Sequence, residues 1–246
     1  MSGALSREQY LASLSAESAT FTASVVRAGL DAAVPGCPEW TVSDLVWHLT
    51  EVHYFWSWMV EGERTSPEGY VPPDRPTDGA ALVGLYEATA KHLLDVLGGV
   101  DPDRPVWSWA NDHSAGFVQR RMPHETAVHR VDADAAAGVP AQMDPALASD
   151  GIDEFLEHFL AGDTDAIAMV AGSVHLHCID VAGEWTVRPT ASGWDLTREH
   201  AKGDCALRGP AADLLMVLWH RAPLASIDVV GDADVAVRFL AASRRS

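Results

Sequence analysis

The feature that most constrains the fold is a series of four helix-length segments in the first part of the chain, separated by stretches rich in proline and glycine. Apolar residues recur at helical spacing within them, and Ser6 and Thr41 or Ser43 stand where N-cap residues are expected. Long amphipathic helices joined by loops bury their apolar faces against one another. The predicted helices of an antiparallel bundle are residues 6–33, 41–60, 78–97 and 117–137.

The pattern changes near Asp150. A helix is predicted around Ile152–Ala161, and short alternating runs separated by turn residues fill residues 166–210, which is typical of an antiparallel meander. Strands bracketed by helices favour an α+β domain. The predicted elements that follow are an apolar helix, a strand and a closing helix at residues 211–223, 226–232 and 233–245.

We therefore predict an α+β protein with two domains. At 246 residues the chain is long enough for each domain to bury a core. The first domain, residues 1–149, is predicted to be a four-helix bundle. The second, residues 150–246, is predicted to be a small α+β domain with an antiparallel sheet.

Charge narrows the possible partners. The formal net charge is −18, whereas nucleic-acid binding needs a basic surface, so we expect no nucleic-acid partner. The charge also disfavours anionic membranes, and no apolar run approaches the roughly 20 residues that span a bilayer. The opening MSGALSREQY lacks the regions of a signal peptide, so we expect a cytoplasmic protein.

The three cysteines, Cys37, Cys178 and Cys205, are widely separated and odd in number. They form neither a CxxC pair nor a plausible disulfide framework, so we expect reduced and mostly buried thiols. A thiol reaction at this protein would then use a thiol from outside the chain.

A candidate metal site begins in the stretch MPHETAVHRVDAD, where Glu125 and His129 are four residues apart and share one helix face. Alone, such a pair is usually solvated surface charge. On the second predicted helix, however, His48 lies in an apolar stripe and is expected to point into the bundle, where facing helices can build metal sites. Two imidazoles and one carboxylate leave an open position on zinc, the catalytic pattern. The stripe consists of Leu45, His48, Val52, Phe55 and Met59.

Other polar residues near these positions have predicted roles. Asp132, three residues after His129, is expected either to accept a hydrogen bond from the second ring nitrogen or to pair with a nearby arginine. His124 is turned by about 100° from its neighbour and is predicted to lie at the rim. His53 points away from the stripe.

A rival pair occurs in VHLHCID, where His175 and His177 alternate onto one face of a predicted strand. The sequence pattern places no acidic or histidine partner beside them. We therefore interpret this pair as structural.

Three segments carry a resemblance to a known family. PEWTVSDLVWHLTEVHYFW and HETAVHRVDAD resemble the second-helix and fourth-helix segments of the mycothiol-dependent maleylpyruvate isomerase family, and DLLMVLWHRAPLASIDVVGDADVAVRFL resembles its C-terminal domain. The resemblance covers nearly the whole chain. It implies a DinB-like four-helix bundle followed by the family's C-terminal domain.

The resemblance also implies a site and a cosubstrate. The family's metal ligands map onto His48, Glu125 and His129, with zinc as the expected divalent metal. Glu125 favours the isomerase branch over the related three-histidine bundles. The cosubstrate implied is mycothiol, a low-molecular-weight thiol of actinobacteria, which agrees with the GC-rich character of the composition. The expected partners are thus a small thiol and a small electrophile; the oligomeric state is left open.

The reaction implied is addition of a thiolate to an electrophilic double bond, rotation, and departure of the thiolate. Two alternatives stay open: mycothiol S-transfer to an electrophile, and a metal- or thiol-sensing protein without turnover. An anionic substrate would need cationic groups. The candidates are Arg120, Arg121 and Arg130 near the predicted site and Arg221 from the second domain.

Overall fold

The computed structural model describes residues 5–140, 142–160 and 164–243. Their contacts divide the chain into two compact units, one spanning Ser6–Gln142 and one that begins at Met143 and includes Leu5. The first unit is helical and the second combines a sheet with short helices, so the predicted α+β class is confirmed. The helices of the first unit are α1 (Arg7–Ala28), α2 (Val42–Glu61), α3 (Gly79–Gly99) and α4 (Ala115–Ala136).

Local chemistry sets the starts of these helices. Ser6 and Thr41 each form a capping box. The hydroxyl accepts a hydrogen bond from the backbone N–H of the third helical residue, and the side chain of that residue accepts one from the backbone N–H of the cap residue. The end of α1 differs from the prediction. The helix ends at Ala28 rather than near residue 33, because Gly29 adopts a φ of 80°, which only glycine adopts without strain.

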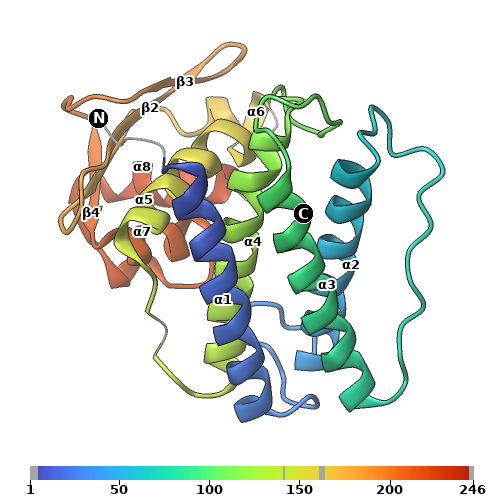
Figure 1. Ribbon diagram of the computed structural model, residues 1–246. Helices are drawn as coiled ribbons and strands as arrows, with labels where there is room; N and C mark the ends of the chain where they lie inside the picture. Colours follow the sequence, from blue (N-terminus) through green and yellow to red (C-terminus); the bar gives the residue numbers. More distant parts are fainter. Residues whose placement is uncertain (1–4, 141, 161–163, 244–246) are drawn as a thin grey trace. The chain divides into compact units, whose positions relative to one another are not determined.

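The four helices pack as a bundle in which α1 and α2 each contact both α3 and α4 (Figure 1). Two helices run in each direction, but α2 and α3 run the same way. His53 lies against Tyr86, and about two turns further along both helices Glu61 lies 3.5 Å from His92. The connection, residues 62–78, therefore passes along the bundle instead of forming a hairpin.

The bundle core has two hydrophobic clusters, one toward each end of α2. Each buries large side chains of several helices, with Trp56 and Met59 in one and Leu45 and Leu49 in the other. Both clusters include side chains of α2 and α4. Packing on either side therefore fixes the side chains of these two helices that face each other between the clusters.

The second unit contains a five-stranded sheet of order β3-β2-β1-β4-β5. The first three strands form the predicted antiparallel meander. The fourth strand was expected to continue the meander, but β4 pairs in parallel with β1. The segment between β3 and β4 therefore starts at the β3 edge of the sheet and crosses β2 and β1. The strands are β1 (Val174–Cys178), β2 (Glu184–Thr190), β3 (Gly193–Thr197), β4 (Cys205–Gly209) and β5 (Asp228–Gly231).

Helices contact this sheet and enclose its apolar side chains. Trp185 of the sheet and Phe239 of the last helix are both fully buried. The helix predicted at residues 152–161 begins earlier, at Pro145, and its last predicted residue lies outside the described ranges. The helical segments are α5 (Pro145–Glu154), a π-turn (Phe155–Phe159), α6 (Thr164–Ala168), α7 (Ala211–Leu218), a 3₁₀ turn (Leu224–Ser226) and α8 (Ala233–Ala242).

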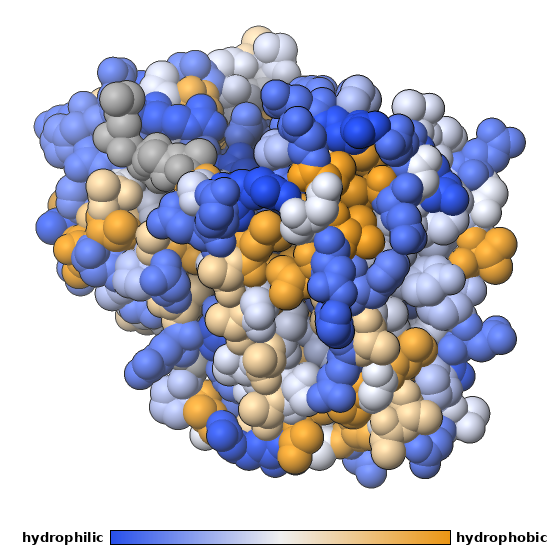
Figure 2. Space-filling view, in the orientation of Figure 1, coloured by the Kyte–Doolittle hydropathy of each residue, from blue (hydrophilic) through white to orange (hydrophobic). Residues whose placement is uncertain are grey.

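Within the described ranges, no helix combines the length and the apolar character that crossing a bilayer requires. Figure 2 shows hydrophilic residues over much of the face in view, with smaller groups of hydrophobic side chains between them. This surface agrees with a composition in which 21% of the residues are charged.

Candidate metal centre

Three potential metal ligands converge between α2 and α4. Nε2 of His48 lies 3.1 Å from Oε1 of Glu125, and Nε2 of His129 lies 3.4 Å from the same oxygen. One donor atom from each residue lies within 4.8 Å of the others. The helical spacing on α4 thus brings the Glu and His together locally, and the packing of α2 against α4 adds the second imidazole.

His48 lies nearer the edge of the buried face than the sequence predicts. Leu49 and His53 are fully buried, whereas His48 and Val52 from the predicted stripe are half-buried. The most buried face of α2 is rotated relative to the predicted stripe, because the helix packs against both α3 and α4. The side chain of His48 is 32% exposed, so one side of the three-residue cluster is accessible from solvent.

Arg121 determines the state of the carboxylate. Its guanidinium lies one turn before Glu125 on α4 and contacts Oε2, while Oε1 faces the two histidines. Burial opposes ionisation of Glu125, but the Arg121 charge and the hydrogen bonds with His129 and His48 hold its pKa well below the ordinary value. Glu125 is therefore a fixed negative charge.

Asp132 orients the buried histidine. Nδ1 of His129 donates to Oδ2 of Asp132 at 2.9 Å, which is one of the two arrangements that the sequence left open for Asp132. Burial opposes protonation of His129, but the hydrogen bonds to Asp132 and Glu125 prevail and raise its pKa to about 9. The carboxylates of Asp132 and Glu125 thus favour a positive charge at His129. Nε2 of His129 is the nitrogen directed toward Glu125.

An aromatic side chain flanks the cluster. The indole of Trp40 lies with its centroid 5.0 Å from the ring of His48 and 6.2 Å from that of His129. Cys37, in the same turn, is half-buried, with its Sγ 3.9 Å from Asp132. The segment between α1 and α2 therefore forms one apolar wall of the site.

Arg130 belongs to a different network. Its three guanidinium nitrogens donate to Glu17 (2.7 Å), Asp134 (2.7 Å) and the carbonyl of Gln142 (2.6 Å). The group is almost fully buried and ties α1 to the end of α4. This geometry gives no support to the prediction that Arg130 contacts a substrate.

The remaining predicted positions, His124, Arg120 and Arg221, do not belong to the three-residue cluster. His124, expected at the rim, is buried, and its ring lies 6.2 Å from that of Tyr10. It is buried because α4 is enclosed by neighbouring helices over most of its circumference. Arg120 is half-buried. Arg221 lies in the second unit, where Nη1 donates to the carbonyl of Trp219 at 2.9 Å, and its role at the site stays a prediction.

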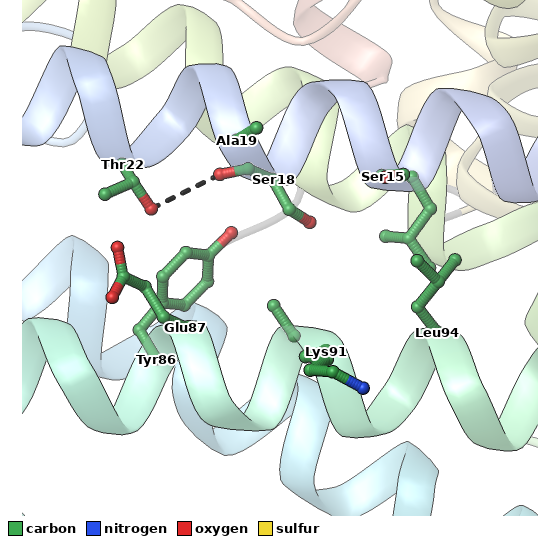
Figure 3. Close-up of a pocket in the computed structure, with 10 residues that line it drawn as sticks. Ser15, Ser18, Ala19, Thr22, Tyr86, Glu87, Lys91 and Leu94 are labelled. Carbon is green, nitrogen blue, oxygen red and sulfur yellow. Dashed lines mark hydrogen bonds between the residues drawn. The ribbon is translucent and has the colours of Figure 1, made fainter.

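A cavity of about 430 Å³ between α1 and α3 contains none of the three potential ligands. Figure 3 shows its lining, with Tyr86 and Glu87 of α3 facing Ser18 and Thr22 of α1. It offers one lysine, Lys91, and no histidine. The potential ligands and this cavity are therefore separate features of the bundle.

The structure also reveals a cluster that the sequence pattern did not predict. His175 and His177 were interpreted as structural because no partner was evident, but Glu184 and His200 join them in the second unit. The register of β2 supplies Glu184 and the crossing segment before β4 supplies His200.

The fold and the first site together define a class: a helical bundle with a two-histidine, one-carboxylate cluster, followed by an α+β unit. The chain belongs to the mycothiol maleylpyruvate isomerase family. Residues 11–134 match the mycothiol maleylpyruvate isomerase N-terminal domain and residues 146–238 match the MDMPI C-terminal domain.

Solved structures agree with this assignment at the level of the fold. The crystal structure of the mycothiol-dependent maleylpyruvate isomerase and that of a histidine-to-alanine mutant each superpose with a TM-score of 0.64. Each is 16% identical in sequence, over 92% of this chain and 93% of the other. No curated protein matches the sequence significantly.

Proposed function

We propose that this protein is a mycothiol-dependent enzyme that isomerises maleylpyruvate or a similar electrophilic substrate, with a divalent metal, zinc, held by His48, Glu125 and His129. The observation that carries the proposal is the convergence of these three donors within 4.8 Å. Family membership supports the thiol and the isomerisation. We also propose that residues 1–149 act as the metal-binding domain and 150–246 as the C-terminal domain.

The residues fit such a metal. Two imidazole nitrogens and one carboxylate oxygen are ligand types that zinc accepts, and three protein ligands are the catalytic pattern. The half-exposed side of the cluster at His48 gives access for a further ligand. When bound, zinc supplies Lewis acidity that stabilises a thiolate at neutral pH.

The chain's own residues prepare this site. Asp132 holds the proton on Nδ1 of His129 and so keeps Nε2 as the ligating nitrogen. Arg121 keeps Glu125 ionised and fixes its orientation. Trp40 shields one side of both imidazoles from water, which strengthens electrostatic interactions there.

In the proposed reaction the thiolate sulfur forms a bond to one carbon of the cis double bond. Rotation about the resulting single bond and departure of the same thiolate give the trans product, so no thiol is consumed. Arg221 is proposed to bind a substrate carboxylate and stabilise the enolate charge.

S-transfer to a neutral electrophile is a second candidate. The net charge of −18 does not attract a dianion. Arg121 is paired with Glu125, and Arg130 with two carboxylates. Two of the cations predicted to hold an anionic substrate are thus engaged, which favours an uncharged substrate.

The test combines metal content with turnover. Wild type, His48→Ala and Glu125→Gln are loaded with zinc, dialysed, and incubated with mycothiol and maleylpyruvate. His92→Ala is the control, because His92 also faces a carboxylate, Glu61, but on the exposed helix surface.

We expect both site variants to lose one zinc and all turnover, while the control keeps both. A trans product without thiol consumption identifies an isomerase, and a thiol conjugate identifies a transferase. Equal zinc in wild type and the site variants would refute the metal site. Zinc and thiol binding without turnover on any electrophile would favour a sensor.

A further inference from the structure

The second unit carries four potential metal ligands on one face of its sheet. His175 and His177 are two residues apart on β1 and therefore project to the same side. Glu184 of β2 is the direct register partner of His177, and cross-strand partners have Cβ atoms about 5 Å apart. Strand pairing alone thus places the carboxylate beside one imidazole.

His200 reaches the same face by topology. It lies between β3 and β4, which are separated in the sheet by β2 and β1. The connecting segment must therefore cross the strands that carry Glu184, His175 and His177. Nδ1 of His200 comes to 2.8 Å from Oε2 of Glu184.

The donor atoms are close enough to share one ion. Nδ1 of His177 lies 2.8 Å from Oε1 of Glu184, and Nε2 of His175 lies 3.6 Å from Oε2. One donor from each of the four residues lies within 4.8 Å of the others. A tetrahedral zinc site with bonds near 2.0–2.1 Å has ligand–ligand distances of about 3.4 Å, so small rotations of the side chains suffice.

The hydrogen bonds within the cluster leave one buried imidazole nitrogen unpaired. His175 is buried, and its Nε2 makes no hydrogen bond. The hydroxyls of Thr186 and Thr197 on the same face are likewise buried without partners. Buried polar atoms are normally paired, so an imidazole nitrogen aimed into a group of ligands indicates a missing partner.

The charges near the cluster suit a cation. The one carboxylate, Glu184, faces all three imidazoles and so places a negative charge beside a bound ion. Arg208, opposite His177 on β4, is exposed, so solvent and salt weaken its repulsion.

We propose that His175, His177, Glu184 and His200 bind a divalent transition-metal ion of the zinc class. Three imidazole nitrogens and one carboxylate oxygen fill a tetrahedron, the pattern of a closed structural site. The ion would fasten the segment before β4 to the β1–β2 pair. His200 is the ligand that this segment contributes, and its side chain is 77% exposed.

The test uses the full-length chain with His48→Ala and His129→Ala combined, which removes the bundle cluster. Zinc stoichiometry is measured after dialysis, and Co²⁺ absorption reports tetrahedral coordination. We expect one equivalent of zinc in this background and two in wild type. His177→Ala with Glu184→Gln, added to the background, should abolish the remaining equivalent, whereas His92→Ala should not.

His200→Ala guards against misfolding, because its side chain is exposed and its loss removes no core contact. It should weaken zinc binding by about 100-fold or more, since loss of outer-shell partners alone costs about 10–100-fold. Zinc should also raise the melting temperature of the background but not of the variant lacking His177 and Glu184.

A background that binds no zinc, or binding unchanged by His200→Ala, would overturn the proposal. Failure of the bundle site gives a different result. Wild type and the background would then bind the same single equivalent, still sensitive to His177→Ala.

Discussion

The buried imidazole of His53 leads to a prediction about acid stability. His53 is fully buried on α2, with Nε2 3.0 Å from Oγ1 of Thr126. The Thr126 hydroxyl donates its only proton to the carbonyl of Met122 at 2.8 Å. Nε2 of His53 must therefore be the donor and Nδ1 the unprotonated nitrogen, which makes no hydrogen bond. Protonation would create a buried charge with no partner.

The magnitude follows from the pKa. Burial lowers the pKa of His53 from 6.5 to about 4, with Glu125 opposing and His48 and His129 adding to the shift. Because the folded-state pKa is the lower one, the unfolded chain binds more protons between these values. The stabilisation is present above pH 6.5 and is lost as the pH falls toward 4. Between pH 7.5 and 4.5 the loss is about 2.5 kcal/mol.

The assay is urea unfolding of wild type and His53→Gln at several pH values, with EDTA present throughout. Glutamine keeps an N–H donor for Thr126 but does not titrate. The free energy of unfolding of the wild type relative to the variant should fall by about 2.5 kcal/mol from pH 7.5 to 4.5. The same substitution at exposed His92 is the control for replacing a histidine by glutamine. Parallel curves for wild type and His53→Gln would refute the reasoning.

Three further predictions concern neighbouring groups. Asp132→Asn should weaken zinc binding about 10–100-fold in a chelator competition, because it removes the carboxylate that orients His129; unchanged affinity would exclude this role. Arg130→Met should lower the free energy of unfolding by about 3–5 kcal/mol, because the buried carboxylate of Asp134 and the half-buried one of Glu17 lose their partner, while zinc content stays the same. Burial raises the pKa of Cys178 to about 12 and that of Cys205 to about 11, so neither thiol should be alkylated at pH 8 until urea unfolds the chain. Mass spectrometry of the labelled peptides would show early modification if this is wrong.

Features that depend on local spacing could be predicted from the sequence. The capping boxes at Ser6 and Thr41 use residues three positions apart, and the contact between Glu125 and His129 follows from one helical turn. The hydrogen bond from His129 to Asp132 is local in the same sense. The meander of β1 to β3 was also predictable, because alternation and turn residues act over short distances.

Features that depend on the rotation of whole elements were not predictable in the same way. The apolar stripe predicted that His48 faces the bundle, but it did not show that His48 lies at the rim while His53 lies inside. Several helices pack against α2, and the sum of those contacts decides which face is deepest. The partners of Arg130 likewise come from α1 and from the end of its own helix.

The sequence by itself determined the class of fold, the division into a helical part and a part with a sheet, and the local Glu125–His129 pair. Only the tertiary structure decided which distant side chains join such local pairs. His200 shows the physical reason most directly: it meets Glu184 and His175 because β4 pairs in parallel with β1, so the chain must cross the sheet. Strand order is a property of the whole packed unit, and no spacing along the chain encodes it.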